Sequence, residues 1–297
     1  MLSWQRSFPL SAKRGHHGYM TYDVIVIGGG PAGLSGAVAL GRALRSVLVI
    51  DSGAGRNAPA EGIHNFLTRD GMTPAEFRAA GRAEVERYGG TVVDGEVATA
   101  APGFEVTLTD GAVHRARRLL VTTGLTDVLP DVPGLAEGWG STVLHCPYCH
   151  GYEVRGRAIG VLGTPGEEMT EHRLRLWGQW SPDVRLLPLD EVAAVEPGGV
   201  RMKDGALIER EYLVVGTQLR ARAGFLESLG LKAAEHPMGI GTYVPAIDPS
   251  GRTEVPGVWV AGNVTDPMAQ VITSAAAGLT AGAMINADLL PPAPDKQ

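Results

Sequence analysis

Residues 22–33 read Tyr-Asp-Val-Ile-Val-Ile-Gly-Gly-Gly-Pro-Ala-Gly, and an Ala- and Leu-rich stretch follows them. The β-branched run at residues 22–27 is typical of a buried parallel strand, and it leads directly into a glycine-rich turn and a helix. In such a dinucleotide-binding fingerprint, the first glycine allows a tight turn, the second lets the backbone approach a pyrophosphate, and the third lets the helix pack closely on the strand. The helix N-terminus supplies the positive end of the dipole. The residues predicted to contact a dinucleotide here are Gly28, Gly30, Pro31, Ala32 and Gly33.

A second buried strand is predicted at residues 46–50, and it ends at Asp51. This acid follows the glycines by about twenty residues, where a carboxylate can hydrogen-bond the hydroxyls of an adenosine ribose. Both strands, the helix and the acid occur at the spacing that the fingerprint requires. A dinucleotide site is therefore a better interpretation than a glycine-rich turn without a ligand.

The length and composition exclude several classes of protein. A chain of 297 residues is longer than one hydrophobic core usually organises. At roughly 100–200 residues per domain, we expect two domains. A net charge of -6 without a Lys/Arg run argues against nucleic-acid binding. No stretch approaches the ~20 apolar residues of a membrane span, and residues 1–19 lack the apolar centre of a secretory signal. We therefore expect a cytoplasmic protein with no membrane partner, and a disordered extension at residues 1–19 that is either native or an addition.

The two cysteines of the chain lie in the sequence His145-Cys146-Pro147-Tyr148-Cys149-His150. They are too close together to cross-link distant segments, and a structural zinc site normally needs a second such pair, so we expect a redox pair and no metal. A thiol with a pKa of about 8.5 is only a few per cent thiolate at neutral pH and needs activation. A helix N-terminus beneath the pair would lower the thiol pKa, and His150 could act as the acid/base, although a histidine in a surface loop is the alternative.

A strand runs into a polar turn again at residues 255–263 (Val-Pro-Gly-Val-Trp-Val-Ala-Gly-Asn), and a helix is predicted to start near Gln270. This segment resembles the second FAD-binding motif of the thioredoxin reductase family, which is usually written with Gly-Asp where this chain has Gly262-Asn263. Asparagine is neutral and can donate as well as accept hydrogen bonds. The resemblance implies that FAD is the cofactor and that it is also bound by Asn65, Thr123, Gly124, Gly262, Asn263, Gln270 and Val271.

The same resemblance implies roles for the cysteines. Cys149 would face the flavin C4a carbon, and Cys146 would exchange with the substrate. The thioredoxin reductases carry an aspartate where this chain has His150. The resemblance also places Gln270 and Val271 with their backbone N–H groups toward the flavin pyrimidine edge, and Asn65 near the isoalloxazine, although Asn65 could instead cap a loop.

A second dinucleotide turn is expected after the cysteines, and it is degraded. Residues 163–168 read Gly-Thr-Pro-Gly-Glu-Glu, so Pro165 replaces the second glycine and Glu168 the third. A carboxylate ~4 Å from a phosphate costs about 4 kcal/mol at an effective dielectric of ~20, which is almost a thousandfold in affinity. The paired arginines that grip a 2′-phosphate are also absent after residues 184–187. We therefore do not expect NADPH to bind.

The motif at residues 146–153 and the degraded turn together resemble the dithiol oxidases of gliotoxin and holomycin biosynthesis, a branch of the thioredoxin reductase-like flavoproteins. That resemblance implies a homodimer that oxidises a small-molecule dithiol to its disulfide and passes the electrons through FAD to O₂, producing H₂O₂. The alternatives are an NADPH- or ferredoxin-dependent reductase of the thioredoxin type and a non-catalytic flavin redox sensor. The sequence does not name the dithiol.

The expected fold is α/β, a two-domain Rossmann-like flavoprotein disulfide oxidoreductase with a degraded NADPH-binding domain. We predict a discontinuous FAD-binding domain at residues 20–128 and 223–297, and a central region at residues 129–222 that carries the redox pair.

Overall fold

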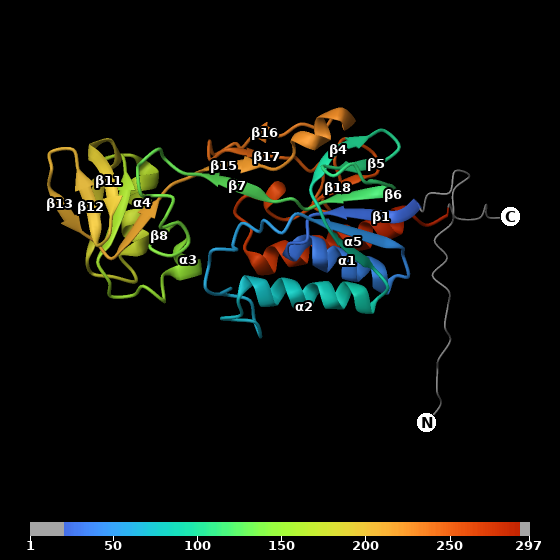
Figure 1. Ribbon diagram of the computed structural model, residues 1–297, viewed down its shortest axis with the longest axis horizontal. Helices are drawn as coiled ribbons and strands as arrows, with labels where there is room; N and C mark the ends of the chain where they lie inside the picture. Colours follow the sequence, from blue (N-terminus) through green and yellow to red (C-terminus); the bar gives the residue numbers. More distant parts are fainter. Residues whose placement is uncertain (1–20, 292–297) are drawn as a thin grey trace, which may run out of the picture. The chain divides into compact units, whose positions relative to one another are not determined.

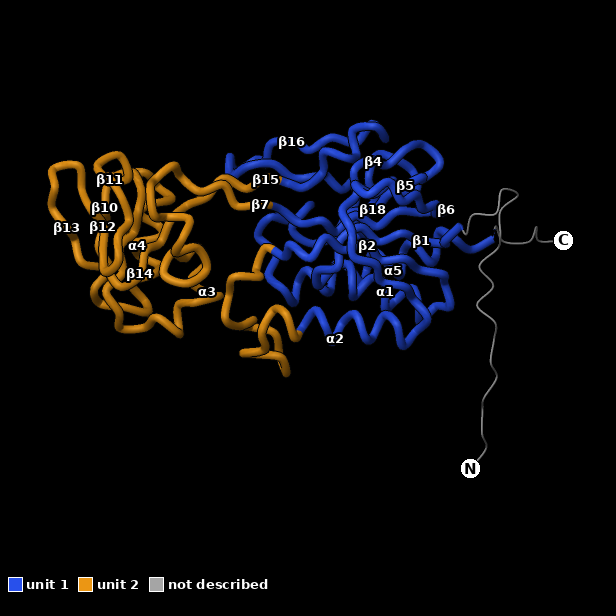
Figure 2. The backbone as a smooth tube through the Cα atoms, viewed as in Figure 1, with its two compact units in different colours: residues 1–55, 77–125, 221–297 blue, residues 56–76, 126–220 orange. Residues whose placement is uncertain are grey.

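The computed structural model describes residues 21–291, and the extension predicted at residues 1–19 lies outside them. The chain folds into two compact units (Figure 2). Of the described residues, unit 1 contains 21–55, 77–125 and 221–291, and unit 2 contains 56–76 and 126–220. The sequence placed the domain boundaries near residues 128 and 223 and gave no sign that residues 56–76 associate with the second unit.

Unit 1 is built on one seven-stranded sheet. Its parallel part has the order β3-β2-β1-β6, with β18 also paired to β6. These strands are β1 (Thr21–Ile27), β2 (Val47–Asp51), β3 (Thr91–Asp94), β6 (Val113–Val121) and β18 (Val258–Val260). Two further strands, β4 (Val97–Ala101) and β5 (Glu105–Leu108), extend the sheet from β6 in antiparallel fashion.

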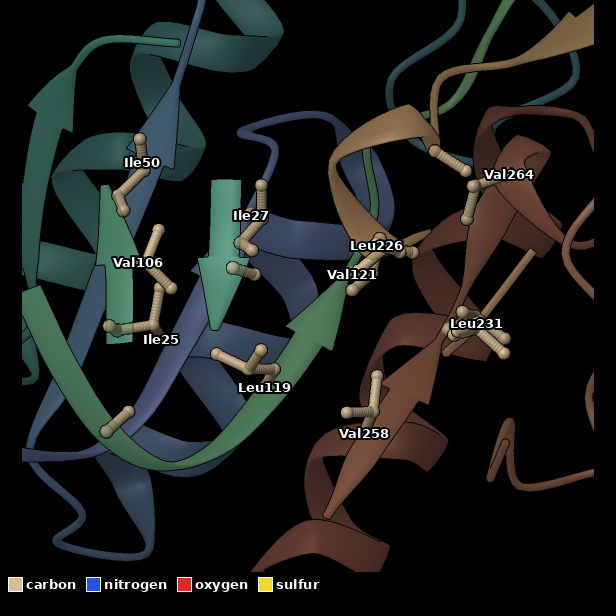
Figure 3. Packing of buried hydrophobic residues seen from close by; sticks show 14 of the residues in the cluster. Ile25, Ile27, Ile50, Val106, Leu119, Val121, Leu226, Leu231, Val258 and Val264 are labelled. Carbon is tan, nitrogen blue, oxygen red and sulfur yellow. The ribbon is translucent and has the colours of Figure 1, made fainter. Parts of the chain in front are cut away.

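Strands β2 and β18 and the second half of β1 are buried and largely apolar because both faces of the sheet are covered there. Ile25, Ile27 and Val121 point to one face and pack with Leu226 and Val264 from later segments (Figure 3). The alternate residues of β1, such as Val24 and Val26, point to the other face and pack against α1 and α5. Side chains alternate across a strand, so the run at residues 24–27 supplies both cores.

Helices α1 (Pro31–Arg42), α2 (Pro74–Arg87) and α5 (Val271–Asp288) lie on the same side of the sheet (Figure 1). Helices α1 and α5 touch at glycines. A Cβ at Gly278 would lie 1.9 Å from the carbonyl oxygen of Ala32, and one at Gly282 would lie 2.8 Å from that of Gly36. These pairs run in the same chain direction, so the two helices are parallel and their N-termini point to the same edge of the sheet.

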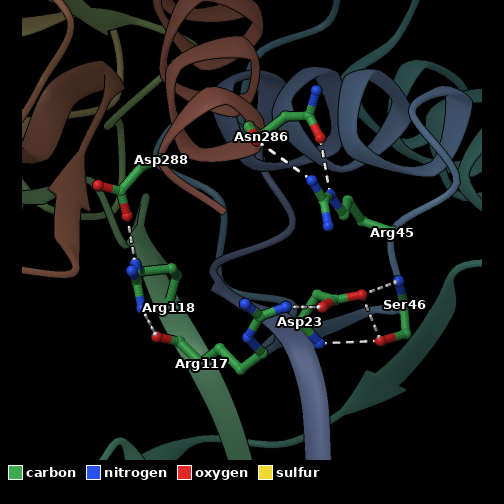
Figure 4. Close-up of polar contacts among 7 residues, drawn as sticks. All are labelled: Asp23, Arg45, Ser46, Arg117, Arg118, Asn286 and Asp288. Atoms are coloured by element: carbon green, nitrogen blue, oxygen red, sulfur yellow. Dashed lines mark hydrogen bonds and ion pairs between the residues drawn. The ribbon is translucent and has the colours of Figure 1, made fainter. Parts of the chain in front are cut away.

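Hydrogen bonds join the start of β1 to neighbouring segments (Figure 4). The Asp23 carboxylate accepts from the Ser46 backbone N–H at 3.0 Å and pairs with Arg117 at 2.8 Å. Arg45 donates through Nε to the side-chain oxygen of Asn286 at 2.7 Å, which links the loop before β2 to the end of α5. These contacts lie at the edge of the sheet opposite the glycine turn.

Unit 2 has a four-stranded parallel sheet of order β10-β9-β14-β8 and a separate three-stranded antiparallel sheet, β11-β12-β13. Two short helices, α3 (Pro147–His150) and α4 (Glu168–Trp177), accompany the parallel sheet. The strands are β8 (Val143–Leu144), β9 (Ile159–Gly163), β10 (Val184–Pro188), β11 (Val192–Glu196), β12 (Gly199–Met202), β13 (Leu207–Glu209) and β14 (Tyr212–Val215). The chain enters and leaves this unit through β7 (Leu125–Val128) and β15 (Gln218–Ala221), which pair with each other.

The α/β, Rossmann-like fold predicted from the sequence is confirmed, with parallel strands at the centre of each unit. Among residues 21–291, no helix combines the length and apolar character needed to cross a membrane.

The glycine contact between α1 and α5 gives a prediction of stability. Gly278→Ala should lower the free energy of unfolding by about 2 kcal/mol, because the new methyl group collides with backbone that cannot move independently. This is opposite in sign to the gain of about 1 kcal/mol that alanine normally brings to a helix interior. Chemical denaturation checks the change. Gly224→Ala is the control, since a Cβ there has no heavy atom within 4 Å, and an equal loss in both variants would contradict the packing argument.

Candidate functional site

The glycine turn after β1 is closed by backbone contacts. Gly28 has φ +112° and donates its N–H to the carbonyl of Ile50 at 2.8 Å. A Cβ at Gly28 would lie 2.4 Å from the carbonyl oxygen of Thr122, and one at Gly33 would lie 1.9 Å from that of Gly28. Neither position accepts a side chain without moving the strand or the helix.

The same turn is not covered by other atoms at Gly30. Gly30 is the N-cap of α1, and a Cβ built on it meets nothing within 4 Å. Pro31 occupies the first turn, and no side chain caps the helix. The first N–H groups of a helix have no intrahelical acceptor, so this end can receive a phosphate.

Asp51 ends β2 beside this turn. Its side chain is buried, and its Oδ2 atom has no hydrogen-bond partner among the described residues. Its Oδ1 atom accepts the N–H of Gly53 at 3.2 Å. An unpaired buried carboxylate oxygen is unfavourable, and a ribose hydroxyl would satisfy it. The residues present therefore fit the nucleotide half of FAD.

The Thr-Gly turn after β6 uses its hydroxyl groups inside the protein. Thr122 Oγ1 donates to the carbonyl of Gly28 at 2.8 Å, and Thr123 Oγ1 donates to that of Arg222 at 2.6 Å. Gly124 follows with φ +68°. Any donor that Thr123 and Gly124 offer to the cofactor is thus a backbone N–H.

Asn65 lies in unit 2, with the cysteine motif. Its side-chain amide donates to the backbone carbonyl of Tyr148 at 2.6 Å, and its N–H donates to Asp70 at 2.9 Å. The backbone of Asn65 has φ +59°, a conformation that asparagine tolerates better than most residues. This side chain supports the turn between the cysteines, and its assignment to FAD stays a prediction.

The two cysteines flank the start of α3. Cys146 is the N-cap of this short helix and accepts the N–H of Cys149 through its carbonyl at 3.2 Å. Both thiols are free and half-buried. The helix predicted beneath the pair is therefore present.

The two thiols differ in acidity. The pKa of Cys146 is lowered to about 7, mainly because the thiol of Cys149 donates a hydrogen bond to its sulfur, with help from the N–H groups of Cys149 and Tyr148. The charge of Arg56 lowers it further. That same hydrogen bond and burial raise the pKa of Cys149. Of the two thiols, Cys146 is therefore the one that ionises first, while Cys149 keeps its proton.

His150 closes α3, and both of its ring nitrogens are buried without a hydrogen-bond partner among residues 21–291. Burial lowers the pKa of His150 below its ordinary value, and the Cys146 carbonyl and Glu153 oppose this only in part. The ring is therefore neutral at pH 7 and keeps an unused basic nitrogen.

His145 differs from His150 in having a fixed partner. Its Nδ1 lies 3.1 Å from the carbonyl oxygen of Val215, so Nδ1 carries the proton. Burial lowers the pKa of His145 as well. The hydrogen bond gives His145 a structural role at the end of β8.

An ion pair near the cysteines was not found from the sequence. Arg56 binds Asp127 through two hydrogen bonds of 2.7 and 2.8 Å, and Thr217 donates to the same carboxylate at 2.9 Å. The Asp127 side chain is only 4% exposed. Arg56 and Asp127 are 71 residues apart, so no local pattern announces the pair.

Residues 56–76 bring further charged side chains to the cysteine motif. His64 lies 3.6 Å from Glu153 through Nε2 and 3.4 Å from Asp70 through Nδ1.

Within the described part of the chain, no group of three His, Cys, Asp or Glu side chains is arranged to hold a metal ion.

The second nucleotide turn, between β9 and α4, is acidic at the start of the helix, where Glu167 is the N-cap and Glu168 follows it. A Cβ at Gly163 would lie 2.4 Å from Thr170 Oγ1, and that hydroxyl donates to Glu167 at 2.7 Å. The Arg173 guanidinium covers Gly216, where a Cβ would lie 2.5 Å from its terminal nitrogen. Pro165 removes one backbone donor from the turn.

Aromatic side chains border the cysteine turn. Tyr148 is 58% exposed and meets Trp180 edge-to-face at 5.9 Å between ring centroids. Tyr152 is 65% exposed and stacks beneath Arg155. Gly151, between the two tyrosines in sequence, is buried, and a Cβ there would lie 2.8 Å from the Trp180 ring. This side of the motif is apolar and accessible.

The charge of Arg56 gives a prediction about thiol acidity. Arg56→Gln should raise the pKa of Cys146 above its value of about 7, so that less than half of the thiol is ionised at pH 7. The pH dependence of iodoacetamide labelling of the reduced protein measures it. Asp127→Asn breaks the same ion pair but keeps the cation, so its labelling midpoint should not rise. A rise in both variants would assign the effect to disturbed structure instead of charge.

Comparisons with known proteins agree with this geometry. The model of the family Pyridine nucleotide-disulphide oxidoreductase matches residues 22–164. "Thioredoxin reductase tcpT" of Claviceps purpurea (strain 20.1) is 33% identical over 90% of this chain and 94% of its own length. "Thioredoxin reductase sirT" of Leptosphaeria maculans is 31% identical over 89% of this chain and 93% of its own.

Among solved structures, HlmI is 39% identical with a TM-score of 0.81, over 91% of this chain and 92% of the other. An oxidoreductase from Agrobacterium tumefaciens is 33% identical with a TM-score of 0.84, over 92% and 100%. These similarities confirm the family resemblance and the FAD cofactor expected from the motifs. The chain therefore belongs to the thioredoxin reductase-like FAD flavoproteins of the pyridine nucleotide-disulphide oxidoreductase family.

Proposed function

We propose that this protein is an FAD-dependent dithiol oxidase that closes the two thiols of a small molecule into a disulfide, with O₂ as electron acceptor and H₂O₂ as product. The observation that carries the proposal is the second nucleotide turn, where Pro165 removes a backbone donor and Glu167 and Glu168 begin helix α4, while the redox pair is retained. If NADPH cannot bind there, electrons enter from thiols and leave to a diffusible acceptor. The similarity to HlmI supports this branch of the family.

The acidity of the pair suits this direction. In the oxidised pair, a substrate thiolate attacks Cys146 and forms a mixed disulfide, and Cys149 leaves and takes up a proton. The second substrate thiolate then attacks the substrate sulfur and expels Cys146 as a thiolate. A leaving thiol with a pKa of about 7 departs faster than an ordinary thiol. The substrate becomes a disulfide and the pair becomes a dithiol. FAD, when bound, would supply the acceptor for these two electrons and their route to O₂.

His150 is the proposed base for the substrate thiols. Its ring nitrogens have no partner among the described residues, and its lowered pKa keeps it unprotonated at neutral pH. The exposed rings of Tyr148 and Tyr152 would hold the apolar body of the substrate. We further propose that the active form is a cytoplasmic homodimer, which small-angle scattering of the purified protein tests.

The second candidate is a disulfide reductase, which is favoured by the name thioredoxin reductase of the Claviceps purpurea and Leptosphaeria maculans relatives. It differs in the source of electrons, because NADPH or ferredoxin would reduce the flavin and the cysteine pair would reduce a protein disulfide.

Anaerobic flavin absorbance separates the two candidates. Dithiothreitol should bleach the flavin band within the dead time of manual mixing, while equimolar NADPH should leave it oxidised, because the carboxylate in the turn costs about a thousandfold in affinity. Cys149→Ser should not bleach with dithiol, whereas Cys146→Ser keeps the thiol expected to face the flavin and should show a charge-transfer band. Rapid bleaching by NADPH would establish the reductase instead.

The role of His150 is tested by the pH profile of turnover. His150→Ala should lower dithiol oxidation ~10²–10⁴-fold at pH 7 while sparing FAD content, since that is the usual contribution of a general base. Wild-type turnover should fall only as the pH drops below 6.5, because the pKa of His150 lies below that ordinary value. Above the substrate thiol pKa of ~8.5 the mutant and wild type should converge. His145→Ala is the control, and a larger loss there than at His150 would show that the base is the other histidine.

A further inference from the structure

We propose that Asn263 is a positioning residue for the cofactor, because its carboxamide holds the backbone that precedes α5 and turns the N–H of Gln270 away from Asn263. This inference rests on the FAD cofactor of the family and not on the proposed substrate or acceptor. The place of Asn263 in the chain is also where the family motif usually has an aspartate.

The side-chain amide of Asn263 is surrounded by carbonyl oxygens. Its Nδ2 donates to Ala269 at 2.8 Å, to Asp266 at 3.0 Å and to Pro267 at 3.3 Å. Two amide hydrogens are thus shared among three acceptors of one loop. A carboxylate has no hydrogen to donate, so an aspartate here would face three oxygen atoms of partial negative charge.

The contact with Ala269 fixes the next peptide unit. No cis peptide bond occurs among the described residues, and in a planar trans peptide the C=O and the following N–H point in opposite directions. Because the carbonyl of Ala269 points to Asn263, the N–H of Gln270 points away from it. That N–H has no hydrogen-bond acceptor among residues 21–291.

Gln270 is the N-cap of α5, and no side chain caps this helix of 18 residues. Helix α5 runs parallel to α1, and the contact between Gly278 and Ala32 leaves the first six residues of α5 extending beyond the start of α1. At 1.5 Å per residue this extension is about 9 Å. A dinucleotide whose pyrophosphate meets the start of α1 therefore has its remaining part toward the start of α5, at the carboxyl edge of the sheet.

Two donors at that edge then differ in how they are held. Backbone approaches at Gly28 and Gly33 fix the turn at residues 28–33, whereas the peptide that carries the Gln270 N–H is oriented by the side chain of Asn263. A helix N-terminus with an oriented N–H stabilises negative charge, and reduced flavin is anionic near neutral pH. By orienting this N–H, Asn263 thus favours reduction of the flavin.

The test compares purified holoprotein of the wild type with Asn263→Asp, Asn263→Ala and Asn286→Asp. Asn286→Asp is the matched control, since it makes the same chemical change on α5 but its oxygen accepts from Arg45, and a carboxylate keeps that contact (Figure 4). Two quantities are measured: the dissociation constant of FAD from flavin fluorescence on dilution, and the equilibrium between oxidised and reduced flavin against a reference dye.

At pH 8, Asn263→Asp should weaken FAD binding about tenfold or more and shift the flavin equilibrium about tenfold toward the oxidised form, the usual effect of losing a hydrogen bond to a charged group. Both defects should shrink at pH 5, because a protonated aspartate can donate one hydrogen bond. Asn263→Ala should show changes in the same direction without the pH dependence, and Asn286→Asp should match the wild type.

Several results would overturn the inference. One is an equilibrium between oxidised and reduced flavin that is the same in Asn263→Asp as in the wild type at pH 8. Another is a lowered thermal stability with unchanged flavin properties, because that result indicates a purely structural role. If Asn263→Asp does not fold, a wild-type equilibrium in Asn263→Ala has the same consequence. None of these readouts uses dithiol turnover, so failure of the oxidase proposal leaves them unaffected.

Discussion

The structure of unit 1 depends on the close approach of backbone to backbone around α1. The first turn of α1 lies against the turn after β1 at Gly33, and α5 lies against α1 at Gly278, with 1.9 Å to a carbonyl oxygen from any Cβ placed at either position. Only glycine permits both contacts. These contacts hold two parallel helices against one face of the sheet, with the N-termini of both helices at the carboxyl edge of the strands. The dinucleotide site is therefore built from closely packed backbone that cannot move.

The chain contains two strand–turn–helix units, and their turns have diverged in physical character. In unit 1 the space above Gly30 is open and the Asp51 carboxylate keeps an unused oxygen. In unit 2 Pro165 stands in the turn, and Glu167 and Glu168 lie at the start of α4. The same topology thus offers phosphate-binding backbone in one place and an acidic helix start in the other. This difference favours thiols over NADPH as the source of electrons in the proposed reaction.

The reactivity of the cysteine pair is set by its neighbours more than by its spacing. The thiol of Cys149 and the N–H groups of the first turn of α3 stabilise the Cys146 thiolate, and the cation of Arg56 adds to this. Arg56 is in turn held by the buried carboxylate of Asp127. The segment at residues 56–76 therefore serves unit 2, although unit 1 contains the residues on both sides of it.

Local patterns in the sequence determined the fold class, the first glycine turn, Asp51, the cysteine pair with His150 and the loss of the second turn. Each of these features depends on residue periodicity or turn chemistry within a few residues. It can therefore be predicted without knowledge of the tertiary structure. Only the tertiary structure decided that Arg56 meets Asp127, that Asn65 supports Tyr148 83 residues away, and that the amide of Asn263 closes on three carbonyls. A polar side chain does not specify its partner by type, because many donors and acceptors are chemically equivalent. Which of them meet depends on how the packed strands and helices bring distant backbone together.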